Sequence, residues 1–339
     1  MNAYHIWMMG PSRSGKTTLL ASIIYDFKRI SEEASRNDDC VLKLQAIGDT
    51  YSRINSRIDK IQAATYDGCF DTGCLEGTQD HEVFRVGLDY QKKAIPLFEP
   101  KFEMHFHDFP GGWLSQPEKI DKTNYNEAEV LIIPIDSSLV FEAVTAREKS
   151  SAATQLELAS LKDTARIWAN MRKEKKRGGL LLFVPVKCET YFNDHAKLGL
   201  QKDQSQALHD KLFSNQFFRP VKETIRDIYP EITAWYLPVD TVGCCYISRK
   251  KWIQSPEYGS ELSLRYTIPS GAYWKPYGPA NIMLHIIEYV ISQQVSNNTW
   301  FDFLIDGLGW RTKLNENINR MKAVCKNTSI PYSRGYKLW

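Results

Sequence analysis

The stretch YHIWMMGPSRSGKTTLL (residues 4–20) joins a short apolar run to a glycine-containing loop and then to residues that favour a helix. The apolar run over residues 4–9 predicts a buried strand, and a helix is expected from Lys16 toward residue 30. Residues 10–17 read G-P-S-R-S-G-K-T, a complete phosphate-loop pattern in its required setting of strand, loop and helix. A glycine turn before a capped helix is the alternative explanation.

Each position of this loop has a role if it holds phosphate. The backbone N–H groups and the helix N-terminus would face the anion, the Lys16 ammonium would reach the terminal phosphates, and the Thr17 hydroxyl would be a magnesium ligand. Lys16 is thus the expected catalytic cation. The expected nucleotide contacts of this segment are Gly10, Pro11, Ser12, Arg13, Ser14, Gly15, Lys16, Thr17 and Thr18.

Hydrophobic patterning beyond the loop predicts an α/β fold. Residues 82–90 and 101–107 alternate between apolar and polar side chains, which predicts an antiparallel hairpin. Residues 130–136 and 179–187 are nearly continuous apolar runs, as in central parallel strands covered by helices. We therefore expect a mostly parallel sheet with one antiparallel edge strand, flanked by helices and carrying insertions. Further expected elements are strands over residues 41–47 and 232–239 and helices over 152–176, 204–228 and 282–295.

Chain length and composition suggest how these elements are organised. At 339 residues the chain has room for one large domain or two smaller ones. We expect a domain over residues 1–297, with a helical insertion near 49–66 and a Tyr- and Trp-rich excursion over 244–279. Residues 298–339 form a basic, aromatic tail. Docking of this tail on the domain or on a partner is favoured over stacking on single-stranded nucleic acid.

Bulk properties exclude several classes of protein. A net charge of +3 is too small to indicate nucleic-acid binding. No secretory signal precedes the loop, and the most apolar helix, over residues 281–295, is interrupted by His285 and Glu288, so we expect no membrane span. The seven cysteines lack the paired spacing of a zinc site. Reduced thiols and a cytoplasmic location are expected.

The segment HFHDFPGG (residues 105–112) supplies a second group of candidate residues. Asp108 lies at the expected end of a strand, where its carboxylate can bind a magnesium-bound water. The backbone N–H of Gly111, three residues later, can sense a terminal phosphate. A D-x-x-G spacing alone commonly marks a turn, but its place after a hairpin and downstream of the loop favours the phosphate interpretation.

In motif order the chain resembles the GTPases of the translation-factor and Ras-like class, whose second strand runs antiparallel to an otherwise parallel sheet. It is most similar to the bacterial double-GTPases, also described as GTPase-like conflict-system proteins, which carry a helical insertion before the first switch and DFPGG-like motifs. The resemblance covers residues 1–296. It implies a P-loop fold, bound GTP or GDP and a magnesium ion.

The resemblance also assigns roles to residues outside the loop. After the strand LLLFVPVKCET (residues 180–190), it implies that Lys187 packs against the base and that Glu189 accepts hydrogen bonds from guanine, although Val186 replaces the usual Asn or Thr. In LEGTQDHEVFRV (residues 75–86), it implies that Thr78 is a magnesium ligand and part of the catalytic site. Thr65 and Thr72 are alternatives to Thr78.

A departure from the family concerns the attacking water. Where Ras-like proteins carry Gln directly after D-x-x-G, this chain has Gly112 and then Trp113. The residue that positions water must come from elsewhere, or hydrolysis is slow.

The resemblance implies a magnesium-dependent GTPase that hydrolyses GTP slowly as a molecular switch, with a bacterial conflict or defence system as one setting. An effector or activating protein is the expected partner, and nucleic acid is the less favoured one. A nucleotide-binding scaffold with little hydrolysis and an ATP-dependent phosphotransferase are the alternatives.

Overall fold

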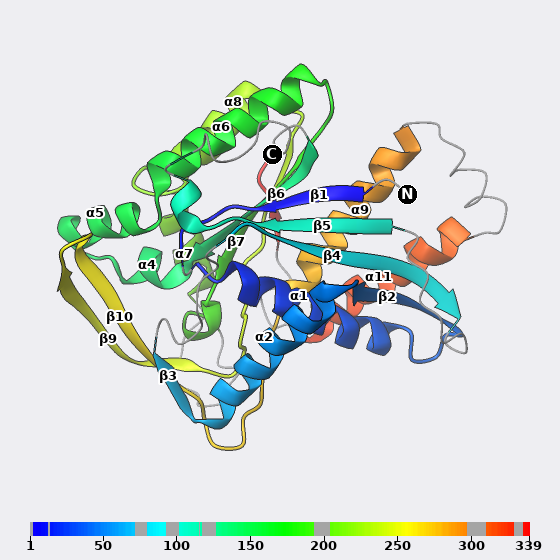
Figure 1. Cartoon of the computed structure of the whole chain (residues 1–339), viewed down its shortest axis with the longest axis horizontal. Coiled ribbons are helices and arrows are strands. Elements are labelled where there is room, and N and C mark those ends of the chain that lie inside the picture. The colour runs from blue at the N-terminus through cyan, green and yellow to red at the C-terminus, as the bar shows by residue number, and fades with distance from the viewer. Residues whose placement is uncertain are drawn as a thin grey trace.

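The computed structural model describes residues 3–12, 14–71, 80–92, 102–114, 116, 127–192, 204–296, 310–328 and 335–339. In these residues eight strands form one sheet with the order β11-β8-β7-β6-β1-β5-β4-β2 (Figure 1). Its strands are β1 (Ala3–Met8), β2 (Cys40–Ala46), β4 (Glu82–Lys92), β5 (Phe102–Asp108), β6 (Ala128–Asp136), β7 (Leu180–Val186), β8 (Thr233–Tyr236) and β11 (Tyr336–Lys337). Helices cover both faces, so the chain has an α/β fold.

The sheet is mostly parallel, as predicted. β1 pairs in parallel with β5 and β6, and β7 and β8 continue the parallel set. The predicted hairpin is confirmed, because β4 pairs antiparallel with β5 from Glu82 opposite Asp108 to Leu88 opposite Phe102. The antiparallel hairpin strand β4 is an inner strand and not the expected edge, because β2 pairs antiparallel with its outer side. Both edge strands, β2 and β11, pair antiparallel with their neighbours.

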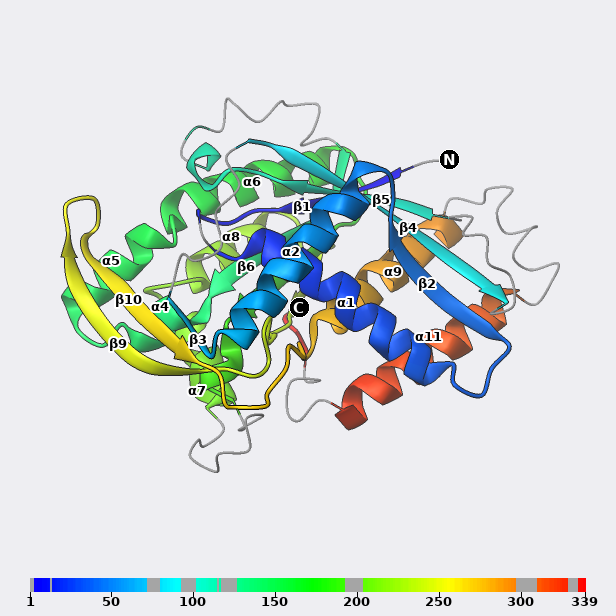
Figure 2. The same ribbon diagram turned by 60° about the horizontal axis from the view of Figure 1, so that its bottom comes forward.

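One face of the sheet is covered by α1 (Lys16–Ala34), α2 (Asp49–Tyr66), α9 (Pro279–Ser296) and α11 (Trp310–Thr328). Ile6 and Met8 of β1 are fully buried here against α1 residues such as Leu19 and Ile23. The predicted insertion near 49–66 is α2, which packs on α1 (Figure 2).

The other face is covered by α4 (Ser137–Glu142), α5 (Ala146–Gln155), α6 (Leu158–Glu174), α7 (Ser205–Leu212) and α8 (Arg219–Ile228). Each of the two long helices predicted here is in fact a pair. The first is interrupted at Glu157, whose φ of 49° is left-handed, and Pro220 at the start of α8 marks the second break. Burial on both faces explains why β6 and β7 are continuously apolar.

The Tyr- and Trp-rich excursion contains a second sheet. β9 (Tyr246–Ser255) and β10 (Gly259–Thr267) form a hairpin, and β3 (Cys69–Asp71) pairs with β10 on its other side. Alternate residues Leu262, Leu264 and Tyr266 of β10 are buried. The hairpin lies along α5 (Figure 2).

The described parts of residues 298–339 pack on the main sheet and its helices. Leu314, Ile318, Met321 and Cys325 of α11 are buried in the same core as α1 and α9. Lys322 forms an ion pair with Glu288 of α9. This part of the expected tail therefore contributes to the core. Across the described residues, the structure contains no helix with the length and apolarity that a membrane crossing requires.

Candidate functional site

The loop at residues 10–15 lies where the strand order changes direction. β1 is central, and the chain first adds β5, β4 and β2 on one side and then β6, β7 and β8 on the other. The carboxyl ends of β1, β5, β6, β7 and β8 therefore meet at one edge of the sheet. In open α/β sheets, ligands bind at this kind of topological switch point.

Two glycines set the conformation of the loop. Gly15 has a φ of 87°, which a side chain would disfavour, and it directly precedes α1. A Cβ at Gly10 would lie 2.9 Å from Ser14 Oγ and 3.1 Å from the Pro134 carbonyl oxygen. Ser14 Oγ is buried and has no hydrogen-bond partner in the described residues. Loop and helix N-terminus thus present N–H groups and a hydroxyl where an anion would be favoured.

Lys16 begins α1 and turns back over the loop. Its buried ammonium donates to the carbonyl oxygens of Gly10 at 2.9 Å and Pro11 at 3.1 Å. Burial lowers the pKa of Lys16, and the nearby carboxylates of Asp108 and Glu157 oppose that shift. A phosphate group would replace these carbonyl contacts with charge-assisted ones, which are stronger.

Thr17 and Asp108 are brought together from distant parts of the sequence. The Thr17 hydroxyl donates to Asp108 Oδ2 at 2.7 Å, and Asp108 is fully buried at the end of β5. A hydroxyl and a carboxylate are the hard oxygen donors that magnesium prefers. The residues present therefore fit a magnesium ion held by Thr17 and, through water, by Asp108. Thr18 follows in the first turn of α1, where its carbonyl accepts from Ser22 Oγ.

Gly111 contacts the loop directly. It begins a short 3₁₀ helix, Gly111–Trp113, and a Cβ added to it would lie 1.9 Å from the Ser12 nitrogen. Only glycine allows this approach. The D-x-x-G segment and the loop at residues 10–15 are consequently in van der Waals contact.

Lys187 and Glu189 follow β7 at the same edge. Val186 lies beside Gly15, with its Cγ2 3.9 Å from the position of a Cβ there. The Lys187 ammonium donates to Asp136, which caps the N-terminus of α4. Lys187 thus follows a residue that lies beside the loop, and its own side chain is paired with the end of β6.

Glu189 is buried against the segment that follows β8. Its Oε1 accepts from the backbone N–H of Val242 at 2.6 Å and of Gly243 at 3.3 Å, and from Thr241 Oγ1 at 3.4 Å. Burial raises the pKa of Glu189, and the backbone hydrogen bonds counter this. One oxygen of the carboxylate that the sequence interpretation assigns to guanine is therefore already engaged by the protein.

Two predicted residues, Arg13 and Thr78, lie outside the described residues, as does Thr72. Thr65, the other alternative to Thr78, is in α2, and its hydroxyl donates to the Gln62 carbonyl oxygen at 2.6 Å.

Sequence reasoning missed several polar residues near the site. Glu157, in the turn before α6, interacts electrostatically with Lys16. Burial raises the pKa of Glu157, and the positive charge of Lys16 opposes this. His107 lies between His5 and His81 and contacts both. Burial lowers the pKa of all three, that of His107 to about 3, so their imidazoles are uncharged near pH 7. Only the alternation of HFH on β5 hinted that His105 and His107 share a face.

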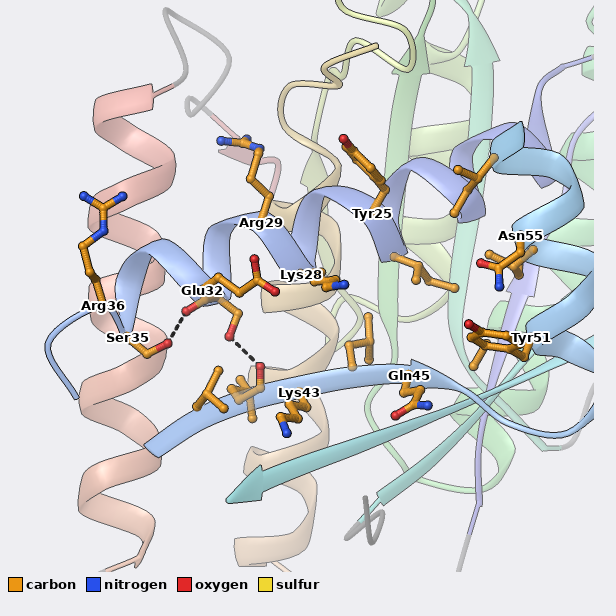
Figure 3. Close-up of a pocket in the computed structure, with 18 residues that line it drawn as sticks. Tyr25, Lys28, Arg29, Glu32, Ser35, Arg36, Lys43, Gln45, Tyr51 and Asn55 are labelled. Atoms are coloured by element: carbon orange, nitrogen blue, oxygen red, sulfur yellow. Dashed lines mark hydrogen bonds between the residues drawn. The ribbon is translucent and has the colours of Figure 1, made fainter. Parts of the chain in front are cut away.

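A separate pocket of about 1070 Å³ lies between α1, β2 and α2 (Figure 3). Tyr25, Lys28 and Glu32 of α1 and Tyr51 and Asn55 of α2 line it. None of the predicted site residues is among its lining, because it faces the second half of α1, away from the loop.

In the part of the chain that the structure describes, no group of three or more His, Cys, Asp or Glu side chains is arranged to hold a metal ion by itself. A magnesium ion at Thr17 and Asp108 would therefore take its remaining ligands from phosphate and water. In comparisons with known proteins, no family model and no curated protein matches the chain.

Proposed function

We propose that the chain is a magnesium-dependent GTPase with a low intrinsic rate that acts as a molecular switch. The observation that carries this proposal is the hydrogen bond between Thr17 and Asp108 at the N-terminus of α1, beside Lys16. Residues 91 positions apart supply a hydroxyl and a carboxylate, and the loop at residues 10–15, which precedes Thr17, offers N–H groups to phosphate.

The chemistry proposed is attack of water on the γ-phosphate in line with the leaving group. Lys16 binds the terminal phosphates and neutralises charge that develops in the transition state. A magnesium ion at Thr17 and Asp108 would supply further positive charge. The Gly111 N–H hydrogen-bonds the γ-phosphate, so loss of that phosphate changes how the D-x-x-G segment packs on the loop. This difference between the two nucleotide states is the basis of the proposed switch.

Guanine is proposed as the base from the order of the motifs and the placement of Lys187 and Glu189. Glu189 already accepts hydrogen bonds from residues 241–243, so adenine is the alternative base that must be tested. Fluorescent GDP and ADP derivatives should be compared for affinity. Equal affinities would contradict the guanine assignment and support an ATP-dependent activity.

The proposed site is tested by Lys16→Ala, with the exposed helical residue Lys60→Ala as the matched control. Nucleotide affinity should fall by about 100-fold or more in the first variant, because two charge-assisted contacts to phosphate contribute about 1.5–3 kcal/mol each. Circular dichroism should show both variants folded. Retained affinity in a folded Lys16→Ala variant would refute the site.

The second candidate function is that of a nucleotide-binding scaffold with little or no hydrolysis. Gly112 favours it, because this exposed residue has no side chain with which to orient water. We expect turnover on the order of 10⁻³ s⁻¹ or less, as for Ras without its activator. A steady-state rate of about 10 s⁻¹ would contradict the proposed switch.

A further inference from the structure

Three histidines form a continuous hydrogen-bonded chain along β1, β5 and the start of β4. His5 Nδ1 lies 2.9 Å from His107 Nε2, and His107 Nδ1 lies 3.1 Å from His81 Nε2. At the far end, His5 Nε2 is 3.5 Å from a carboxylate oxygen of Glu127. Two of these residues belong to neighbouring strands, and the register that pairs Trp7 with His107 brings them together.

The hydrogen bonds that link the three histidines determine which nitrogen of each ring carries the proton. An uncharged imidazole has one donor and one acceptor nitrogen. The Glu127 carboxylate favours a proton on His5 Nε2, which leaves His5 Nδ1 to accept from His107 Nε2. His107 Nδ1 then accepts from His81 Nε2, and His81 Nδ1 is left as an acceptor. In the opposite arrangement a carboxylate would face a lone pair, which is repulsive.

His81 lies beside the D-x-x-G segment. It directly precedes Glu82, which pairs with Asp108 across the hairpin. Its ring stacks on Phe109 with an interplanar angle of 1° and a centroid distance of 4.4 Å, and the Asp108 carboxylate acts on it electrostatically. Its Nδ1 has no hydrogen-bond partner in the described residues. An acceptor nitrogen is thus held next to the segment whose Gly111 touches the phosphate loop.

We propose that His81 supplies the water-orienting group that Gly112 cannot provide, by accepting a hydrogen bond from the attacking water at Nδ1. His107 and His5 are positioning residues, which fix the ring and its tautomer. This inference rests on the proposed function, since it assigns a residue to the hydrolysis reaction. It requires only a hydrogen bond to water and no change in the charge of the histidines.

The tautomer is tested without nucleotide by long-range ¹H–¹⁵N NMR of the full chain. His81 should carry its proton on Nε2 in the wild type. His5→Phe removes the acceptor that orients His107, so the His81 signals should shift toward a mixture of tautomers. A proton on His81 Nδ1 in the wild type would overturn the proposal, as would His81 signals that are unaffected by His5→Phe.

Single-turnover hydrolysis provides the second test. His81→Ala should reduce the rate by about 100-fold with nucleotide affinity unchanged, because misplacing a reacting group by about 1 Å has an effect of this size. His81→Gln should recover part of the rate, since an amide oxygen can also accept from water. His209→Gln is the matched control, because His209 contacts Asp210 and the rings of Phe213 and Tyr236 and not the histidine chain.

The two proposals fail in different ways. Wild-type hydrolysis together with an unchanged rate in His81→Ala would overturn the role of His81 and leave the GTPase proposal standing. No hydrolysis by the wild type would overturn both. Loss of nucleotide binding in a folded His81→Ala variant would also overturn the assignment, since it would place His81 in binding instead of in water orientation.

Discussion

Gly111→Ala is expected to uncouple the D-x-x-G segment from the loop at residues 10–15, and thereby to impair the proposed hydrolysis. The added Cβ would lie 1.9 Å from the Ser12 nitrogen and 2.5 Å from the Pro11 carbonyl carbon, both backbone atoms that cannot rotate away. Ordinary contact begins at 3.4 Å, so the two segments must separate by roughly 1.5 Å. Displacements of about 1 Å reduce rates by about 100-fold. We expect at least that loss in single-turnover hydrolysis, together with weaker binding of GTP than of GDP.

The adjacent glycine provides the control. A Cβ at Gly112 meets no atom within 4 Å, and Gly112 is exposed. Gly112→Ala should therefore keep the wild-type affinity for GTP and GDP and the wild-type rate. The assay is fluorescent-nucleotide titration followed by single-turnover hydrolysis, with thermal unfolding measured for both variants. Equal behaviour of the two variants would refute the contact between Gly111 and the loop as the basis of phosphate sensing.

Three further changes test other parts of the structure. Thr17→Ala should weaken the dependence of nucleotide binding on magnesium, whereas Thr17→Ser, which keeps the hydroxyl, should preserve it; titration with magnesium and with a chelator distinguishes them. Burial lowers the pKa of His285 to about 4 from 6.5, so its contribution to stability is complete above pH 6.5 and is lost as the pH falls toward 4. Between pH 6.5 and pH 4, the free energy of unfolding measured with urea should therefore fall by about 3 kcal/mol less in His285→Phe than in the wild type. Ile318→Ala should reduce the free energy of unfolding by about 2–5 kcal/mol because Ile318 is buried in the core, whereas the exposed neighbour Lys313→Ala should change it little. An unchanged stability in Ile318→Ala would show that α11 does not belong to the core.

The predictable part of the fold is the part encoded by local patterns. Continuous apolar runs identified β6 and β7, and alternation identified β4 and β5, because burial on two faces or on one leaves these signatures. The two-residue strand β11 has no periodicity, and only its backbone pairing with β8 defines it. The break at Glu157 was equally hidden, since a non-glycine residue adopts the left-handed conformation there.

The candidate site divides along similar lines. Residues 10–17 are contiguous, and Asp108 lies at the end of its strand, so spacing and strand order together predict that they meet. The histidine chain depends instead on the register between β1 and β5, and on His81 from a third segment. A shift of that register by one residue would place His5 and His107 on opposite faces. No motif in the sequence encodes such a register.

Glu189 shows how a tertiary contact can change the meaning of a local motif. Its spacing after β7 suggested a carboxylate free to accept two hydrogen bonds from guanine, worth about 1.5–3 kcal/mol each. The structure instead gives its Oε1 three donors from residues 241–243, of which only Val242 N–H, at 2.6 Å, is short. Moving this carboxylate to a base would exchange bonds of similar strength and leave buried N–H groups unpaired. A strong guanine preference therefore requires that the base be read with residues 241–243 in place, through the second carboxylate oxygen or the segment's own backbone.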